Sequence, residues 1–326
     1  MSSTSPSVRI VADIGGTNAR FGHVYVSESE LRVVHTSACA EFPLFVDAIR
    51  AYMARCEDAE IVDICLAVAG PVEQDWIDLP NNHWAFSRRE LERELGVPVA
   101  VINDFSAQVY SIEALGGDDF HWLGSPRPEA ASPGVIAVLG PGTGLGVSGM
   151  LPSGEIIPSE GGHIAFAPNN AHQLALLEQL WRRYERVSVE RLLSGMGLAN
   201  LYWANGMLQG VEKELTAPEI TAGACAGDTL CLQAVEDFSA ILGSVAGDLA
   251  LAMGAYNGVY LSGGILPKML DIIDESLVRD NFQQKGRFSD ICKNIPLAIV
   301  LANYPGLVGC INAANRRHTS PATSKP

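Results

Sequence analysis

Positive charge and aromatic side chains are both scarce in this sequence. Its 326 residues include 37 Asp and Glu but only 22 Lys and Arg, a formal net charge of −15, and aromatic residues make up 7% of the chain. A nucleic-acid surface needs a concentrated face of Lys and Arg, and here basic residues never run longer than adjacent pairs. Nucleic acid is therefore excluded as a partner. An anionic ligand is not, because surface charges are screened over roughly 8 Å at physiological salt, whereas a bound ligand is held at hydrogen-bond distance.

Paired cysteines, long apolar runs and a leader pattern are also missing. The seven cysteines are scattered, their number is odd, and none belongs to a Cys-x-Cys or Cys-x-x-Cys pair, so neither a disulfide framework nor a zinc site is expected. The longest apolar region, 240–266, is interrupted by Asp248, Asn257 and several glycines, which argues against a membrane span. Residues 1–7 are polar and lack the charged-then-apolar order of a signal peptide. We expect a soluble, cytoplasmic protein.

What the chain does have is glycine and apolar residues in a repeated order. It contains 32 Gly, and 48% of its residues are hydrophobic, which suits α/β domains with tight turns after strands. Strand, glycine turn and strand are predicted over 8–26 and again over 135–151, a shift of about 126 residues. The length fits two domains, so the pattern favours a duplicated α/β fold.

The first candidate site is Asp13-Ile14-Gly15-Gly16-Thr17-Asn18, directly after a predicted strand. Adjacent glycines let backbone N–H groups approach phosphate oxygens with no Cβ in the way. Thr17 and Asn18 add side-chain donors, and the Asp13 carboxylate can hold the hydration shell of Mg²⁺. We expect Asp13, Gly15, Gly16, Thr17 and Asn18 to bind nucleotide phosphates. The alternative is an ordinary hairpin turn with an acidic neighbour.

Two more glycine-rich turns follow later in the chain. In Gly140-Pro141-Gly142-Thr143-Gly144, the candidates for a second phosphate contact are Gly142, Thr143 and Gly144. This turn is not a P-loop, because no Lys follows and it opens a strand rather than a helix. In Ser262-Gly263-Gly264, after a predicted strand, Gly263 and Gly264 permit flat approach of a base or ribose. A tight hairpin and a plain strand-to-helix turn are the structural alternatives.

An acidic residue, Asp104, follows another predicted strand between the first two turns, in Val101-Ile102-Asn103-Asp104-Phe105. A carboxylate in such a place can orient a hydroxyl nucleophile for phosphoryl transfer. It can also cap the helix predicted to begin at Phe105. Two phosphate turns, an adenosine turn and a connecting acid, in this order, resemble the actin-like ATPase superfamily.

Two further segments narrow the resemblance. Glu160-Gly161-Gly162-His163 and Ser188-Val189-Glu190-Arg191-Leu192-Leu193-Ser194-Gly195, together with the turns above, are similar to bacterial ATP-dependent glucokinases of the proteobacterial type. The similarity runs over about residues 10–315. It implies that Asp104 is the catalytic base, taking the proton of the sugar 6-hydroxyl. The residues that it implies in binding sugar hydroxyls are Asn81, Asn103, Glu160, His163 and Glu190.

The resemblance also implies an architecture and a reaction. We expect two α/β domains with a duplicated RNase H-like fold around a central cleft. A small domain of residues 1–114 plus 306–326 would carry the first phosphate turn, and a large domain of 115–305 the second turn, the sugar-binding elements and the adenosine turn. The expected reaction is transfer of the γ-phosphoryl group of ATP to the 6-hydroxyl of D-glucose, giving glucose 6-phosphate and ADP at the start of glycolysis. Mg²⁺, held by Asp13 through water, and a homodimer are implied as well.

Some alternatives stay open at this point. Sugar kinases of the ROK type share the Gly-His element but continue it with a Cys-rich zinc segment, whereas here no cysteine follows His163 before Cys225, so zinc is not expected. The substrate could be another hexose such as mannose, fructose or N-acetylglucosamine. A sugar or nucleotide sensor without phosphotransfer would not need Asp104. For His163 a core histidine, for Glu190 a first-turn helix acid, and for Glu160 a solvated loop carboxylate are the structural alternatives.

Overall fold

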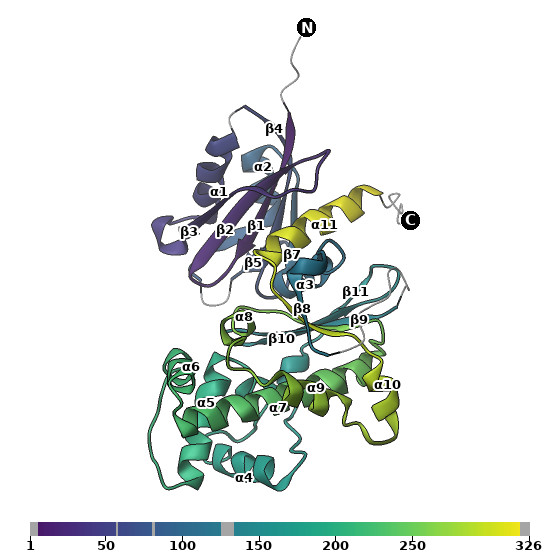
Figure 1. Ribbon diagram of the computed structural model, residues 1–326. Helices are drawn as coiled ribbons and strands as arrows, with labels where there is room; N and C mark the ends of the chain where they lie inside the picture. Colours follow the sequence, from purple (N-terminus) through teal and green to yellow (C-terminus); the bar gives the residue numbers. More distant parts are fainter. Residues whose placement is uncertain (1–5, 57, 80–81, 125–133, 320–326) are drawn as a thin grey trace. The chain divides into compact units, whose positions relative to one another are not determined.

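The chain folds into two compact units of mixed α/β structure. The computed structural model describes residues 6–56, 58–79, 82–124 and 134–319. Unit 1 consists of residues 1–115 and 303–326, and unit 2 of residues 116–302. Each unit has its own mixed β-sheet with helices beside it (Figure 1). The α/β class predicted from the sequence is confirmed.

Unit 1 is built on a five-stranded sheet in the order β3-β2-β1-β4-β7. Its strands are β1 (Ser7–Ile14), β2 (Asn18–Tyr25), β3 (Arg32–Ala38), β4 (Glu60–Val68) and β7 (Val99–Asn103). Strand β1 pairs antiparallel with β2 and parallel with β4, and β4 pairs parallel with β7. The carboxyl ends of β1, β4 and β7 therefore lie at one edge of the sheet.

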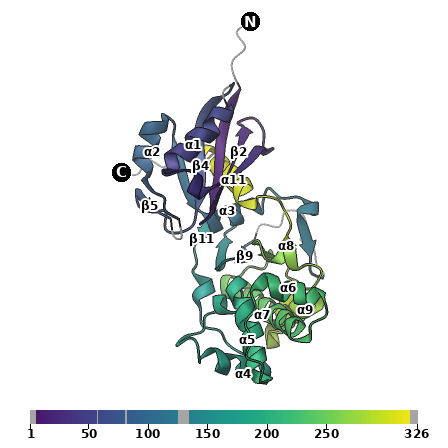
Figure 2. The ribbon, with the colours of Figure 1, turned by 90° about the vertical axis from the view of Figure 1, so that its left-hand side faces the viewer.

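Helices cover both faces of this sheet. They are α1 (Phe45–Met53), α2 (Arg88–Leu95), α3 (Asp104–Ser111) and α11 (Pro305–Thr319). Successive residues of β4 point to opposite faces, so Leu66 packs in one core with Phe45 of α1, and Cys65 packs in another with Leu307 of α11. Figures 1 and 2 show α1 and α2 on one side of the sheet and α11 on the other. A small hairpin of β5 (Trp76–Asp78) and β6 (Ala85–Ser87) completes the unit.

Unit 2 repeats the sheet of unit 1 and adds one strand. Its order is β11-β10-β9-β12-β13-β8. The strands are β8 (Phe120–Trp122), β9 (Ile136–Pro141), β10 (Leu145–Met150), β11 (Ile156–Ile157), β12 (Val259–Leu261) and β13 (Leu297–Val300). Strand β9 pairs antiparallel with β10 and parallel with β12, as β1 does with β2 and β4. The matching order and directions confirm the duplication that the two glycine turns predicted.

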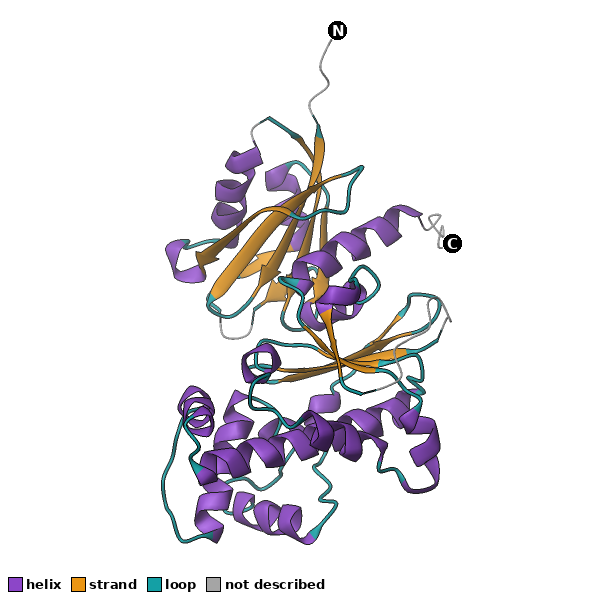
Figure 3. Ribbon diagram, in the orientation of Figure 1, coloured by secondary structure: helices purple, strands orange, loops and turns teal. Residues whose placement is uncertain are grey.

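The helices of unit 2 gather on one side of its sheet, as Figure 3 shows. They are α4 (Ala171–Leu180), α5 (Gly195–Leu208), α6 (Ala217–Cys225), α7 (Thr229–Met253), α8 (Leu266–Met269), α9 (Glu275–Gln283) and α10 (Ser289–Lys293). Helix α7 is long and apolar enough to cross a membrane by length and composition, but 72% of its most apolar window is buried. It is the central core helix of the unit.

The remaining short helices are 3-10 turns. The described ones are η1 (Cys39–Glu41), η2 (Ala54–Cys56), η3 (Gly117–Asp119), η4 (Gly161–His163), η5 (Val189–Arg191) and η6 (Gly286–Phe288). Helix α9 is separate from α8, because the Asp274 side chain accepts a hydrogen bond from the Leu277 N–H and starts a new helix.

Helices α3 and α11 approach each other closely through glycine. A Cβ on Gly309 of α11 would clash with the backbone carbonyl of Ala107 in α3. Gly309→Ala is therefore expected to lower the free energy of unfolding by about 1–3 kcal/mol, although alanine favours helices by about 1 kcal/mol. Thermal and denaturant unfolding would measure this. The control is Gly117→Ala, where a Cβ meets nothing within 4 Å; equal effects in the two variants would contradict the packing argument.

Candidate active site

The first glycine turn lies at the carboxyl end of β1, where the chain reverses into β2. The Gly15 N–H donates to the Asn18 carbonyl at 3.0 Å and closes the turn. Residues 15–18 are all exposed. In the described parts of the chain, the N–H groups of Gly16 and Thr17 have no hydrogen-bond acceptor. Exposed, unpaired N–H groups in a turn suit an anion, which agrees with the predicted phosphate role.

Asp13 is the last but one residue of β1 and comes just before this turn in the chain. Its carboxylate is 3.5 Å from the Arg20 guanidinium on the facing strand β2. Burial raises the pKa of Asp13, and the charge and hydrogen bond of Arg20 oppose that rise. A Cβ on Gly306, in the first turn of α11, would lie 3.0 Å from the carboxylate carbon of Asp13. The amino end of a helix thus approaches this carboxylate, and the helix dipole is favourable there.

Asp104 is the first residue of α3, but the cap of that helix is Asn103. The Asn103 Oδ1 accepts hydrogen bonds from the N–H groups of Phe105 at 2.9 Å and Ser106 at 3.1 Å. The alternative reading of Asp104 as the helix cap is therefore wrong, although its Oδ1 also accepts from Phe105 N–H at 2.8 Å. The Asn103 Nδ2 has only a long contact, 3.4 Å, with the Gly70 carbonyl.

The two acids of unit 1 lie at the same edge of the sheet, separated by one strand. Asp13 and Ile102 both pair with Ala67 of β4. Asp104 therefore lies two residues further along its chain segment than the residue level with Asp13. Burial is the largest cause that raises the pKa of Asp104 to about 6, and the negative charge of Asp13 raises it further, while the Phe105 N–H lowers it. At neutral pH this carboxylate is largely ionised and more basic than an ordinary aspartate.

In unit 2 the second and third glycine turns lie side by side. Strands β9 and β12 are parallel, and the Ser262 N–H donates to the Leu139 carbonyl at 2.8 Å, so both turns emerge at the same edge. Gly263 has φ +112°, and a Cβ there would lie 2.5 Å from the Pro141 carbonyl oxygen. Its missing side chain makes room for the neighbouring turn. Gly264 has no atom within 4 Å of the corresponding position, which leaves space for a ligand.

The three predicted sugar-binding residues of unit 2 come together around the second turn. The Glu190 Oε2 accepts from the Leu145 N–H at 2.9 Å and lies 2.5 Å from where a Cβ of Gly144 would be. The Val189 N–H donates to the Ile164 carbonyl at 2.9 Å, which places Glu190 beside the segment that follows His163. The His163 N–H in turn donates to the Glu160 carbonyl at 2.9 Å. The side chains of Glu160 and His163 are exposed.

Gly162, the second glycine of the Glu160–His163 segment, fixes this arrangement sterically. A Cβ on Gly162 would clash with the backbone carbonyl of Leu145 at the start of β10. The segment can therefore lie against β10 only with glycine at this position. The sequence motif thus has a packing cause as well as a chemical one.

The sequence did not predict every residue of the site, and one predicted residue lies outside the part of the chain that the structure describes. Asn81 is outside the described residues. Its neighbour Asn82 donates from Nδ2 to the Gly15 carbonyl at 3.0 Å, a contact across the sheet that no local pattern predicts. Gly306, which approaches the Asp13 carboxylate, was not predicted either. Within the described ranges, no three His, Cys, Asp or Glu side chains gather as a metal-binding group.

Two repeated sheets with glycine turns at the carboxyl ends of their strands, and an acid after β7, match the fold of ATP-using sugar kinases. A ROK-family glucokinase from Streptomyces griseus, solved with glucose and AMPPNP, has this fold, with a TM-score of 0.64, 20% identity, and coverage of 95% of this chain and 99% of that one.

The family model described as Glucokinase matches residues 10–317, and the chain belongs to the glucokinase family. The glucokinase of Chromohalobacter salexigens is 42% identical over 317 residues, which are 95% of this chain and 98% of that relative. The crystal structure of a glucokinase from an Antarctic psychrotroph has a TM-score of 0.88 and 34% identity, covering 95% of this chain and 99% of that one. Glucokinases phosphorylate glucose with ATP, and this activity is that of the chain.

The raised pKa of Asp104 has a consequence for stability. A carboxyl group whose pKa is higher in the folded protein favours folding at low pH, and that contribution is lost as pH rises from about 4 to about 6. Asp104→Asn is therefore expected to raise the free energy of unfolding by about 1–3 kcal/mol at pH 7.5 and to change it little at pH 4. Denaturant unfolding at both pH values measures this, with the exposed Asp118→Asn as control. A loss of stability at both would show that the carboxylate mainly supports the amino end of α3.

Proposed function

We propose that the protein transfers the γ-phosphoryl group of ATP to the 6-hydroxyl of D-glucose, with Asp104 as the general base. The observation that carries this proposal is the place of the Asp104 carboxylate, one strand away from Asp13 and its phosphate turn. A base works best when its pKa is near the working pH, and a pKa of about 6 leaves Asp104 ionised and more basic than usual. The loose transition state of phosphoryl transfer asks mainly for positioning and charge stabilisation.

The nucleotide is assigned to the glycine turns. We propose that Gly15, Gly16, Thr17 and Asn18 bind phosphate oxygens in unit 1. In unit 2 the proposed contacts come from Gly142, Thr143 and Gly144 for phosphate and from Gly263 and Gly264 for adenosine. The exposed, unpaired N–H groups of the first turn and the open space at Gly264 support these roles. At Gly144 and Gly263 the space of a side chain is taken by Glu190 and the Pro141 carbonyl, so these two glycines would contact the nucleotide through their backbone.

The sugar is assigned to carboxylates and amides, which pair with the donor and acceptor capacity of each hydroxyl. We propose that the residues that bind it are Asn81, Asn103, Glu160, His163 and Glu190. The Oδ1 of Asn103 is committed to the helix end, so its weakly engaged Nδ2 is the group that donates to a sugar oxygen.

Mg²⁺ and the cellular setting complete the proposal. Mg²⁺ takes oxygen ligands and keeps much of its water, and Asp13, a half-buried carboxylate one strand away from a second acid, suits such an ion. We propose that Asp13 holds it through water. When bound, the ion neutralises charge on the phosphates. The seven cysteines are all free and six are buried, which supports a reducing cytoplasm; a homodimer is proposed from the family likeness alone.

The base assignment is tested by Asp104→Asn, which keeps the shape and an acceptor for Phe105 N–H but removes the proton acceptor. Turnover is expected to fall at least about a hundredfold, because general-base loss costs on the order of 10²–10⁴ in rate. Glucose affinity, measured by calorimetry on the same variant, is expected to change little. Asp118→Asn is again the control. Turnover near that of the unchanged protein would refute Asp104 as the base.

Glu190→Gln separates sugar binding from chemistry. Glutamine still offers an oxygen to the Leu145 N–H, so the second turn is expected to stay in place. The lost charge weakens a hydrogen bond to a sugar hydroxyl, which is worth roughly 1.5–3 kcal/mol, or about ten- to a hundredfold in glucose KM. A coupled ADP-release assay over a hexose panel measures KM and kcat, with exposed Glu185→Gln as control. A large fall in kcat at unchanged glucose KM would contradict the sugar-side role.

A further inference from the structure

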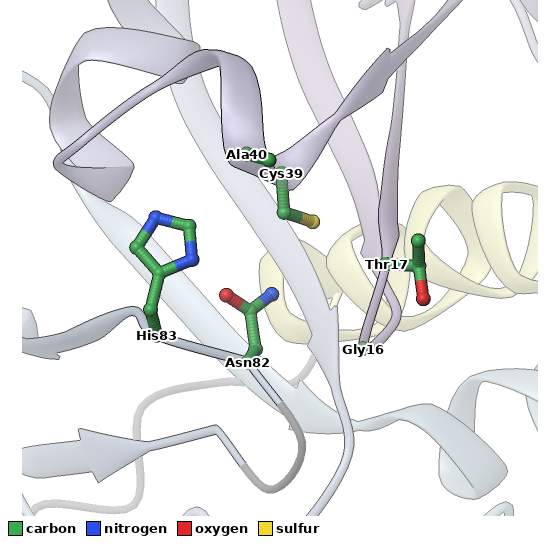
Figure 4. A pocket seen from close by; sticks show the side chains of 6 residues that line it. All are labelled: Gly16, Thr17, Cys39, Ala40, Asn82 and His83. Atoms are coloured by element: carbon green, nitrogen blue, oxygen red, sulfur yellow. The ribbon is translucent and has the colours of Figure 1, made fainter.

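A pocket of about 420 Å³ opens beside the first phosphate turn of unit 1. Figure 4 shows its lining: Gly16 and Thr17 on one side, Asn82 and His83 on another, and Cys39 and Ala40 between them. Asn82 and Cys39 extend toward the turn in this view. Neither residue has a role in the phosphate and sugar contacts proposed above, so their contacts with the turn need an explanation of their own.

Both residues hold the same carbonyl group. The Asn82 Nδ2 donates to the Gly15 oxygen at 3.0 Å, and the Cys39 Sγ lies 3.7 Å from that oxygen. Burial raises the pKa of the Cys39 thiol, so it stays protonated and able to donate. The Cys39 N–H also donates to the Thr17 carbonyl at 2.8 Å. The carbonyls of Gly15 and Thr17 are thus both engaged by neighbouring segments.

Asn82 is itself fixed in one orientation. Its Oδ1 accepts from the Trp84 N–H at 3.1 Å, so only Nδ2 is left to face Gly15. Trp84 is 1% exposed and donates from Nε1 to the Phe42 carbonyl at 2.9 Å. The His83 Nε2 lies 2.9 Å from the same carbonyl. The loop is therefore anchored by the two residues that follow Asn82.

Peptide geometry carries the contact to the other side of the turn. In a planar trans peptide, the C=O of one residue and the N–H of the next point in opposite directions. A bound Gly15 carbonyl therefore directs the Gly16 N–H away from Asn82. We propose that Asn82 is a positioning residue that sets this N–H toward the nucleotide phosphate, with Cys39 as a weaker second donor. The inference rests on the proposed phosphate role of the first turn.

Glycine makes such a brace necessary. With no Cβ on either side, the Gly15–Gly16 peptide can rotate at little steric cost, and a rotated peptide would present its carbonyl oxygen to the phosphate. Two glycines let the backbone of the turn come close to a phosphate, but they do not fix whether the peptide between them presents its N–H or its C=O group. The Asn82 amide, which lies outside the turn, fixes this orientation by its hydrogen bond to the Gly15 carbonyl.

Asn82→Asp is the direct test. The carboxylate keeps the acceptor for the Trp84 N–H but cannot donate to the Gly15 carbonyl, so the peptide is expected to turn its N–H toward Asp. ATP affinity by calorimetry is expected to fall about ten- to a hundredfold. The inhibition constant of adenosine, which has no phosphate, and the thermal midpoint are expected to change little. A merely structural role would weaken ATP and adenosine together, and that result would overturn the proposal.

Asn82→Asp both adds a negative charge and removes the donor that orients the peptide, and a control variant in the same pocket distinguishes the two effects. Ala40→Asp places a carboxylate on an exposed lining residue that makes no contact with Gly15, and it is expected to weaken ATP only a few-fold. An effect as large as that of Asn82→Asp would overturn the proposal. Asn82→Ala removes the donor without adding charge and is expected to show the same selective loss of ATP, which keeps the test decisive if the aspartate variant does not fold.

Thr17→Val distinguishes a wrong role for Asn82 from a wrong phosphate role for the first turn. It removes the hydroxyl of the turn and leaves the Gly15 carbonyl untouched. If Thr17→Val weakens ATP and neither Asn82 variant does, the turn binds phosphate but Asn82 does not position it. If none of these variants weakens ATP, the phosphate role of the first turn is itself wrong, and the inference is overturned with it.

Discussion

Two carboxylates, those of Asp13 and Asp104, lie at one edge of the unit 1 sheet, and the groups around that edge have to accommodate them. The parallel pairing of β1, β4 and β7 brings both acids to one edge. Burial raises the pKa of each, and the negative charge of Asp13 adds to the rise at Asp104. Such an arrangement is unfavourable for folding at neutral pH unless other groups offset it. Arg20, the approach of α11 at Gly306 and the N–H of Phe105 all face these carboxylates. Each is a fixed donor or positive end and stabilises the ionised form of the carboxylate that it faces.

Glycine has two different uses in this protein, and the sequence does not separate them. Gly144, Gly162 and Gly263 lack a side chain because Glu190, the Leu145 carbonyl and the Pro141 carbonyl occupy that space. Gly264 and Gly142, by contrast, have open space or only ordinary contacts at the Cβ position. A glycine-rich motif is therefore partly a ligand signal and partly a record of how closely two backbone segments pack.

Local patterns predicted the longer strands, the glycine turns and their repetition, because each depends on residues close together in the chain. The short strands β5, β6 and β8 were not predicted. Contacts across the chain were not predictable in this way. Asn103, rather than Asp104, caps α3, and neighbouring residues of similar capping preference cannot be told apart by composition. Helix α6 was missed although Thr216 and Glu219 form a capping box before it, a signal present in the sequence. Asn82 reaches Gly15 only after the strands between them have paired.

In each of the two duplicated turns a glycine carbonyl is held by a hydrogen bond, but the donors differ. In unit 2 the Gly142 carbonyl accepts from the Gly195 N–H at 2.9 Å, so a backbone donor orients the peptide that follows. In unit 1 the Gly15 carbonyl is held by the side chains of Asn82 and Cys39. A backbone donor is retained by almost any residue, whereas a side-chain donor is lost by one substitution. The second turn is consequently fixed by the fold itself, and the first depends on the identity of one amide. Since a trans peptide links carbonyl and N–H directions rigidly, that amide controls a group on the far side of the turn without touching what the group binds.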